Sequence, residues 1–329
     1  MEENIVFSIT ISNKLKQELS ERFNVKFADL DICTFPDGEY FVRPLVSVRG
    51  KKAFVFHALS HPVNENIMKL LVTIDSLKRS SAKEIHLIIS YLAYARQDRK
   101  TEARSAITSR LISDLICKAG ATKITLIDLH SEQIEGFFEI PLDHLYTVPI
   151  FAEYLIKNYG KNIEDFIVVS PDFGATKKSR VLSRLLGIPI VIMEKIRSQE
   201  GKIEEQHVYG DVNFKKCIIL DDIIGTGGTI INASKTLKKL GAESVIVCAT
   251  HGLFSGFALN KLKEAYTEGH ISEVLVTDSV PLDKTLPFIK VVSLSKLISS
   301  VLQVYMRGSG SISKIYDEMR NNLFNLRGI

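Results

Sequence analysis

Cysteine is scarce in this chain, and long apolar runs are missing from it. The 329 residues include four cysteines, Cys33, Cys117, Cys217 and Cys248. None stands in a CxxC or short Cys/His spacing, which argues against a zinc site, and mostly apolar surroundings predict buried, reduced thiols. No apolar run approaches the roughly 20 residues that cross a bilayer. The opening segment MEENIVFSIT lacks the basic region and long apolar core of a signal peptide. These absences predict a cytoplasmic protein with no membrane partner.

Charge of one sign is also limited. The net charge is +4 and the sequence pI is about 8.7. No run of lysine and arginine resembles a basic arm, so the sequence predicts no nucleic-acid partner, although local positive clusters can serve small polyanions such as nucleotides. Hydrophobic residues make up 45% and charged residues 24%, which is the balance of a globular protein rather than a disordered one.

Short β-branched runs alternate with amphipathic stretches along almost the whole chain. Several of the runs are apolar without alternation, as expected for strands buried on both faces of a parallel sheet. Helices are expected at 65–80 and 108–121, and an N-terminal strand at the apolar start of the chain. The clearest predicted strands are 52–59, 84–92, 123–130, 166–171, 189–195, 216–223, 244–251 and 273–280.

The strand and helix alternation predicts an α/β fold with mostly parallel sheets flanked by helices. The length favours about two domains. We place the first over 1–147 and the second over 148–300, with similar strand–helix units in each. Residues 301–329 form a tail that contains GSGS and then an amphipathic piece, and this tail is either a terminal helix or partly disordered.

The segment 217–230, CIILDDIIGTGGTI, predicts a strand, a glycine-rich loop and a helix beginning near Ile230. Glycines let backbone N–H groups approach an anion, and a helix N-terminus adds partial positive charge. Asp221 and Asp222 stand where ligands bind in open α/β sheets and can accept hydrogen bonds from sugar hydroxyls. The simpler alternative is a glycine-rich turn with a solvated acidic pair. The segment 217–230 is not a Walker loop, since no GKS or GKT follows its glycines. The predicted sugar-phosphate loop comprises Gly225, Thr226, Gly227, Gly228 and Thr229.

This loop resembles that of the phosphoribosyltransferase fold family, in which an apolar strand, two acidic residues and a glycine- and threonine-rich turn bind a ribose 5-phosphate group. The segment 128–145, DLHSEQIEGFFEIPLDHL, is more selective. It is similar to a segment of the ribose-phosphate diphosphokinases, and the resemblance extends over about residues 1–300. The fold that this resemblance implies is two phosphoribosyltransferase-like domains, with the ATP site in the first and the ribose 5-phosphate loop in the second.

Two segments supply the expected ATP site. FPDGEYFVR at 35–43 offers Phe35 for stacking on a purine, and its carboxylates can accept from an exocyclic amine; taken alone, PDGE is simply a good turn. Taken together with the other motifs, YARQDRK at 94–100 is expected to bind the nucleotide phosphates. Taken alone, the same segment could be a solvated charged loop. The expected ATP-binding set is Phe35, Asp37, Gly38, Glu39, Arg96, Gln97, Arg99, Lys100 and Arg104.

The resemblance further implies Mg²⁺ as cofactor, with His130 and Asp172 among its ligands. Each has a simpler interpretation, namely a satisfied histidine at a strand end and an Asx turn in SPDFGA at 170–175. Lys195 and Arg197 are expected to stabilise charge during diphosphoryl transfer, and Arg197 also to contact ribose 5-phosphate. Their alternation along extended chain lets both reach one side if the strand continues; an exposed basic strand end is the alternative.

The expected activity is transfer of the diphosphoryl group of ATP to the anomeric hydroxyl of ribose 5-phosphate, giving 5-phosphoribosyl 1-diphosphate and AMP. A phosphoribosyltransferase and a non-catalytic regulatory homologue are the alternatives. The family also implies a homo-oligomer, a dimer or a hexamer. Three residues depart from its pattern: Gly225 stands where an aspartate often opens the loop, and Glu102 and Ala106 stand in the 100–108 loop that commonly carries more arginines and a proline.

Overall fold

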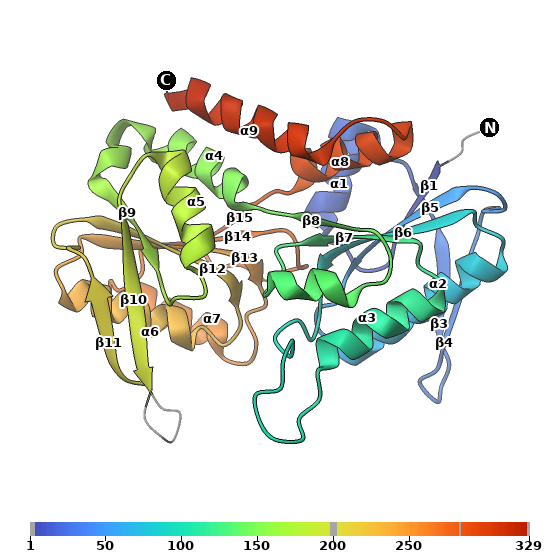
Figure 1. The fold of residues 1–329 in the computed structure, drawn as a ribbon, viewed down its shortest axis with the longest axis horizontal. Coiled ribbons are helices and arrows are strands. Elements are labelled where there is room, and N and C mark those ends of the chain that lie inside the picture. The colour runs from blue at the N-terminus through green and yellow to red at the C-terminus, as the bar shows by residue number, and fades with distance from the viewer. Residues whose placement is uncertain (1–3, 198–202, 283, 328–329) are drawn as a thin grey trace. The chain divides into compact units, whose positions relative to one another are not determined.

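The chain forms two compact units (Figure 1). The computed structural model describes residues 4–197, 203–282 and 284–327, apart from the side chains of 195–206. The first unit comprises Met1–Tyr146 with Ser279–Pro281, and the second comprises Thr147–Asp278 with Leu282–Ile329.

The first unit is built on a parallel sheet in the order β2-β1-β5-β6-β7-β8. Its strands are β1 Asn4–Ser8, β2 Phe27–Ala28, β5 Lys52–Ala58, β6 Glu84–Tyr91, β7 Lys123–Ile127 and β8 Leu142–Leu145. A separate antiparallel hairpin consists of β3 Leu30–Thr34 and β4 Tyr40–Pro44. The helices are α1 Asn13–Phe23, α2 Val63–Arg79 and α3 Thr108–Ala119, with the short 3₁₀ helix η1 Glu132–Phe137.

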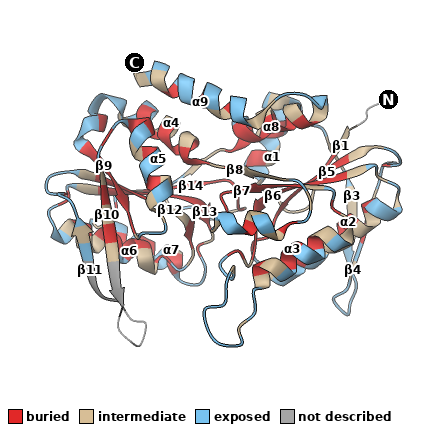
Figure 2. Ribbon diagram, viewed as in Figure 1, coloured by how far each residue is buried: buried red, intermediate tan, exposed pale blue. Residues whose placement is uncertain are grey.

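Central strands of this sheet are buried along nearly their whole length, as Figure 2 shows in red. Burial on both faces explains why 52–58 and 84–91 are apolar without alternation. In α2 the buried side chains include Ile67, Leu70 and Ile74, at the helical spacing that the sequence predicts. These residues therefore determine which face of α2 packs into the core of the first unit.

The second unit has a seven-stranded sheet in the order β11-β10-β9-β12-β13-β14-β15, parallel except for the β10–β11 pair. Its strands are β9 Phe166–Ser170, β10 Ile190–Arg197, β11 Ile203–Tyr209, β12 Lys216–Ile224, β13 Ser244–Gly252, β14 Glu273–Thr277 and β15 Ile289–Val292. Its helices are α4 Val148–Tyr159, η2 Gly160–Asp165, α5 Thr176–Leu186, α6 Gly228–Lys239, α7 Ala258–Thr267, α8 Ser295–Arg307 and α9 Ile312–Arg327.

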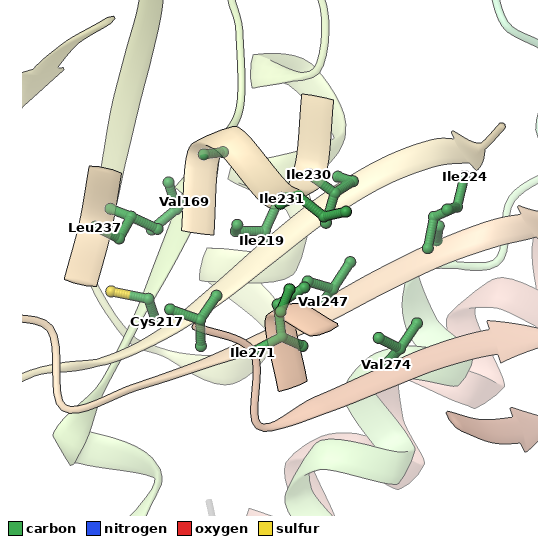
Figure 3. Packing of buried hydrophobic residues seen from close by; sticks show 14 of the residues in the cluster. Val169, Cys217, Ile219, Ile224, Ile230, Ile231, Leu237, Val247, Ile271 and Val274 are labelled. Carbon is green, nitrogen blue, oxygen red and sulfur yellow. The ribbon is translucent and has the colours of Figure 1, made fainter. Parts of the chain in front are cut away.

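Helices cover both faces of this sheet, because alternate residues of each strand enter different cores. Ile219 and Val247 pack with Ile230 and Leu237 of α6 on one face (Figure 3). On the other face, residues such as Ile218 pack against α4 and α5. The β12 strand is therefore held from both sides, which fixes the position of the loop that follows it.

The tail at 301–329 is mostly helical. It supplies the last part of α8 and the whole of α9, which packs against α4, α5 and α8 (Figure 1). Ile315, Met319 and Leu323 are the buried residues of α9. The Arg327 guanidinium also donates to the Leu185 carbonyl at the end of α5, at 3.3 Å. Of the two alternatives for the tail, a terminal helix is correct over the residues that the structure describes.

Every strand predicted from the sequence has a counterpart, but several predictions were wrong in detail, and the strand predicted over 273–280 ends at Thr277. The strand predicted over 123–130 ends at Ile127, because Asp128 takes a left-handed conformation with φ 41°; His130 thus lies beyond the strand, not at its end. All four cysteines are free, yet only Cys217 and Cys248 are buried, whereas Cys33 is exposed on the β3–β4 hairpin. Among the described residues, no helix combines the length and apolar character needed to cross a membrane.

Candidate active site

The glycine-rich loop joins β12 to α6 at the carboxyl end of the second sheet. Gly227 stands just before α6 with φ 79°, a left-handed conformation that L side chains rarely adopt. Its carbonyl accepts the first hydrogen bond of the helix from Ile231 N at 3.0 Å. The loop therefore delivers the N-terminus of a 12-residue helix to the carboxyl edge of the sheet, an arrangement that favours an anion.

A neighbouring segment holds the loop in place. The carbonyl of Ile224 accepts from the N–H groups of Leu253 and Phe254 at 3.0 and 3.1 Å, and that of Gly225 accepts from Ser255 N at 3.0 Å. This bracing segment, 253–255, carries no motif by which it could be predicted from the sequence. Its signal is structural: β13 pairs with β12 up to Gly252, so the residues that follow β13 emerge beside the loop.

Three carboxylates gather at this edge. Burial raises the pKa of Asp221, and the negative charges of Asp222 and then Asp172 raise it further. One Asp221 oxygen accepts from the backbone N–H of Asp222 at 2.9 Å. Since β9 and β12 are parallel neighbours, Asp172 follows β9 near the end of β12. The predicted residues Asp172, Asp221 and Asp222 are thus brought together within the second unit.

Asp172 also shapes its own turn. Its Oδ1 accepts from Ala175 N at 3.1 Å, while its carbonyl accepts from the hydroxyls of Ser170 and Thr176 at 2.7 and 3.3 Å. Asp172 therefore closes a local turn, but its side chain bonds the backbone three residues on, one residue further than in an Asx turn. This bond does not compete with ligand binding, because a carboxylate offers about four lone-pair sites over two oxygens.

Lys195 and Arg197 lie in β10, paired with Gln206 and Ile203 of β11. The register shifts between Ile196 and Arg197. The extra residue at this irregularity is Glu204 of β11, so β10 itself gains no residue between Lys195 and Arg197. The side chains of Lys195 and Arg197 lie outside the described part of the chain.

The β3–β4 turn presents Phe35 at the surface of the first unit, 46% exposed. Gly38 N donates to the Phe35 carbonyl at 2.9 Å, and Phe35 N donates to the Glu39 carbonyl at 2.8 Å. Asp37 Oδ1 accepts from Glu39 N at 3.2 Å, and Gly38 has φ 94°. PDGE is thus a true turn, and this turn leaves the Phe35 ring partly exposed, with an edge-to-face contact to Phe41 at a centroid distance of 6.5 Å.

The 94–104 loop follows β6 and carries exposed cations. Arg96, Arg99, Lys100 and Arg104 are all exposed. Gln97 has an anchoring role, because its side-chain oxygen accepts from the Thr108 hydroxyl at 2.5 Å. The Gln97 carbonyl also accepts from the start of α3, where Ser109 N lies at 3.2 Å and the Ser109 hydroxyl at 3.1 Å. The loop is therefore attached to the N-terminus of α3 with its cations facing solvent.

His130 is exposed and follows β7 in the first unit, whereas Asp172 belongs to the second. Within the residues that the structure describes, no group of three or more His, Cys, Asp or Glu side chains is arranged to hold a metal ion. Neither unit thus carries a complete protein cage for a metal in its described part.

Mostly parallel sheets flanked by helices, with a glycine-rich loop and a helix N-terminus beside an acidic pair, define an α/β protein with a candidate phosphate-binding site. The family profile described as the N-terminal domain of ribose phosphate pyrophosphokinase matches residues 4–120, and that of the phosphoribosyl synthetase-associated domain matches 168–316. The chain belongs to the ribose-phosphate pyrophosphokinase family.

Individual relatives agree over nearly the full length. The ribose-phosphate pyrophosphokinase of Caldanaerobacter subterraneus subsp. tengcongensis is 42% identical, covering 94% of this chain and 97% of its own. That of Ureaplasma parvum serovar 3 is 38% identical, covering 97% and 96%. The crystal structure of phosphoribosylpyrophosphate synthetase from Mycobacterium smegmatis superposes with a TM-score of 0.85 at 36% identity, covering 93% of this chain and 100% of that one.

Proposed function

We propose that this chain transfers the diphosphoryl group of ATP to the anomeric hydroxyl of ribose 5-phosphate, giving 5-phosphoribosyl 1-diphosphate and AMP. The observation that carries the proposal is the β12–α6 loop, where Asp221 and Asp222 are followed by left-handed Gly227, five residues after Asp222, and then by a helix N-terminus. The loop and the helix end suit the 5-phosphate, and the carboxylates suit the ribose hydroxyls. The family relationship supplies the second substrate, ATP.

The reaction itself is a displacement at the β-phosphorus. The anomeric oxygen forms a bond to that phosphorus and gives up its proton, while the bond to the oxygen bridging the α- and β-phosphates breaks and AMP leaves. Positioning and charge neutralisation dominate such transfers. We assign charge stabilisation to Lys195 and Arg197, with Arg197 also contacting ribose 5-phosphate, and phosphate binding to Gly225, Thr226, Gly227, Gly228 and Thr229.

The first unit is assigned the ATP site. The exposed Phe35 ring stacks on the adenine, with Asp37, Gly38 and Glu39 shaping the turn that presents it. The cations of the 94–104 loop bind the ATP phosphates. The hydrogen bond from Thr108 to Gln97 attaches that loop to the start of α3. The predicted domains, 1–147 for ATP and 148–300 for ribose 5-phosphate, with the tail at 301–329, are kept as part of this proposal. The ATP-loop cations are Arg96, Arg99, Lys100 and Arg104.

The donor chemistry fits a divalent cation, which we take to be Mg²⁺. The raised pKa of Asp221 reports negative charge from Asp222 and Asp172 after burial, and a cation would relieve this repulsion. Carboxylate oxygen is the ligand that Mg²⁺ prefers, and Ala175 N orients one oxygen of Asp172. Asp172 and His130 are the residues we assign to hold it. When bound, the ion neutralises charge on the ATP phosphates.

The test is to supply the purified full chain with ATP, Mg²⁺ and ribose 5-phosphate and to follow AMP. AMP should form in equal amount with the sugar diphosphate and only when ribose 5-phosphate is present. Activity only with phosphoribosyl diphosphate and a nucleobase would instead identify a phosphoribosyltransferase. ATP binding without turnover would indicate a regulatory homologue.

We further propose a cytoplasmic homo-oligomer, a dimer or a hexamer. Full-length family relatedness supports both suggestions. Light scattering coupled to size-exclusion chromatography measures the mass directly. A monomer of 36.9 kDa at micromolar concentration would contradict the oligomer. Recovery of the native protein in the membrane fraction would contradict the localisation.

A further inference from the structure

The chain leaves β7 through a turn held by a side chain. Asp128 N donates to the Leu145 carbonyl at 2.8 Å and so continues the pairing between β7 and β8. Asp128 is left-handed, with φ 41°, and the direction of the chain changes there. The next N–H, that of Leu129, donates to Nε2 of His144 at 2.9 Å. His130 is the next residue, so the His144 ring holds the peptide between Asp128 and Leu129, which immediately precedes the peptide between Leu129 and His130.

The same ring has a second partner. Its Nδ1 lies 2.7 Å from Oε1 of Glu135, a residue of η1. Because a backbone N–H can only donate, Nε2 must be the acceptor, and Nδ1 therefore carries the proton and donates to the Glu135 carboxylate. This assigns the neutral Nδ1–H tautomer to His144. The chain Glu135, His144, Leu129 thus runs through two hydrogen bonds to the residue beside His130.

The ring is rigidly placed. The side chain of His144 is 3% exposed and packs on Tyr146 with ring centroids 4.3 Å apart. His144 also lies in β8 opposite Leu126 of β7, so the strand pairing fixes its backbone. Burial raises the pKa of Tyr146 to about 12, with further contributions from the charges of Glu132, Glu135 and Asp128. The tyrosine thus keeps its proton and remains a neutral packing surface for the imidazole.

We infer that His144, oriented by Glu135, is a positioning residue that aims His130 at the metal–nucleotide ligand. The inference rests on the proposed function for the role of His130. A partner that orients a ligating histidine through a hydrogen bond commonly affects metal affinity about 10- to 100-fold. Here the effect passes through the Leu129 peptide. Without the His144 ring, the Leu129 N–H has lost its acceptor. The left-handed conformation of Asp128 is then no longer held by this hydrogen bond, and the backbone at Asp128 can relax.

The experiment compares four variants in the full chain. His144→Leu removes the acceptor, whereas His144→Gln keeps an amide oxygen for Leu129 N. Glu135→Gln keeps an oxygen for the Nδ1 proton. The matched control is His86→Leu. His86 is another buried histidine of the first unit, whose Nε2 lies 2.8 Å from the Thr125 hydroxyl, away from this turn. Binding of Mn²⁺ together with a non-hydrolysable ATP analogue is measured by electron paramagnetic resonance, beside KM for ribose 5-phosphate and the melting temperature.

His144→Leu should weaken the Mn²⁺–nucleotide complex about tenfold or more and leave KM for ribose 5-phosphate within about twofold. His144→Gln and Glu135→Gln should recover most of the affinity, and His86→Leu should lower the melting temperature without weakening the complex. Wild-type affinity in His144→Leu overturns the inference. So does equal weakening in His86→Leu, since the effect would then be general destabilisation.

The same measurements distinguish a failure of the proposed reaction from a failure of the positioning role of His144. A wild-type chain that binds the Mn²⁺–nucleotide complex but forms no AMP contradicts the proposed reaction, while the comparison of His144 variants still stands. A wild-type chain that binds no such complex overturns both. If the wild type turns over and His144→Leu binds the Mn²⁺–nucleotide complex with wild-type affinity, only the positioning role of His144 is overturned.

Discussion

Gly227→Ala tests the phosphate loop most sharply. Gly227 has φ 79°, and a Cβ there would lie 3.5 Å from Cδ1 of Ile231 and 3.7 Å from Cγ of Leu262. Both distances are ordinary van der Waals contacts, so the cost is in the backbone. A left-handed L-residue costs about 1–2 kcal/mol. For a unit of this size, each kcal/mol lowers Tm by about 2–4 °C.

Gly308→Ala is the matched control. Gly308 caps α8 with φ 65°, and a Cβ there would meet no atom within 4 Å. It should lose about as much stability as Gly227→Ala. The Gly227 change should additionally disturb loop N–H groups that bind phosphate. A hydrogen bond to a charged group contributes about 1.5–3 kcal/mol, so loss of one should raise KM for ribose 5-phosphate about tenfold or more.

Thermal melts of both variants and KM for each substrate separate the two effects. We expect similar losses of Tm, a raised KM for ribose 5-phosphate only in Gly227→Ala, and little change in KM for ATP. If both variants lose stability and both keep the wild-type KM, the loop is only a turn. If Gly227→Ala loses no stability, residue 227 does not require the left-handed conformation.

Three further predictions concern charge. Lys195→Ala should lower kcat about 10²- to 10³-fold with nearly unchanged ATP affinity by calorimetry; near-normal turnover removes Lys195 from the catalytic set. Because the folded-state pKa of Asp221 is raised by burial and by Asp222, wild-type stability falls as pH rises from about 4 through that pKa. Asp221→Asn should therefore be more stable by on the order of 1 kcal/mol at pH 8 but not at pH 4 in urea unfolding, and equal stability at pH 8 would contradict this. Burial lowers the pKa of His57 to about 4, so the stability it contributes is complete above 6.5 and lost as pH falls towards 4, by up to about 1.4 kcal/mol per pH unit. His57→Gln should flatten the profile between pH 6.5 and 4, and an unchanged slope would show that His57 is not buried neutral.

The sequence predicted best where burial dominates. Strands such as β5 and β12 are apolar because both faces are covered, and that pattern is visible without a structure. The short or half-exposed strands were missed. The β3 and β4 strands have little buried surface, β8 is four residues long, and β11 is a polar edge strand with sequence IEEQHVY. None of these carries a long apolar run.

The candidate site shows the same division. The segments at 35–43, 94–100 and 217–230 could be predicted because each is a local pattern with its own chemistry. The bond between His144 and Leu129 could not, since it depends on the pairing of β7 with β8. Nor could the bulge beside Arg197, because strand register is set by the partner strand rather than by local sequence. Side-chain contacts between distant segments are therefore what the structure adds.

The most direct test of the central claim follows the transferred group itself. ATP labelled with ³²P at the β-position is incubated with the full chain, Mg²⁺ and ribose 5-phosphate, and the products are separated. We expect the label to move into 5-phosphoribosyl 1-diphosphate while unlabelled AMP is released in equal amount. Label found in ADP or in free diphosphate, with none on the sugar, would contradict this expectation.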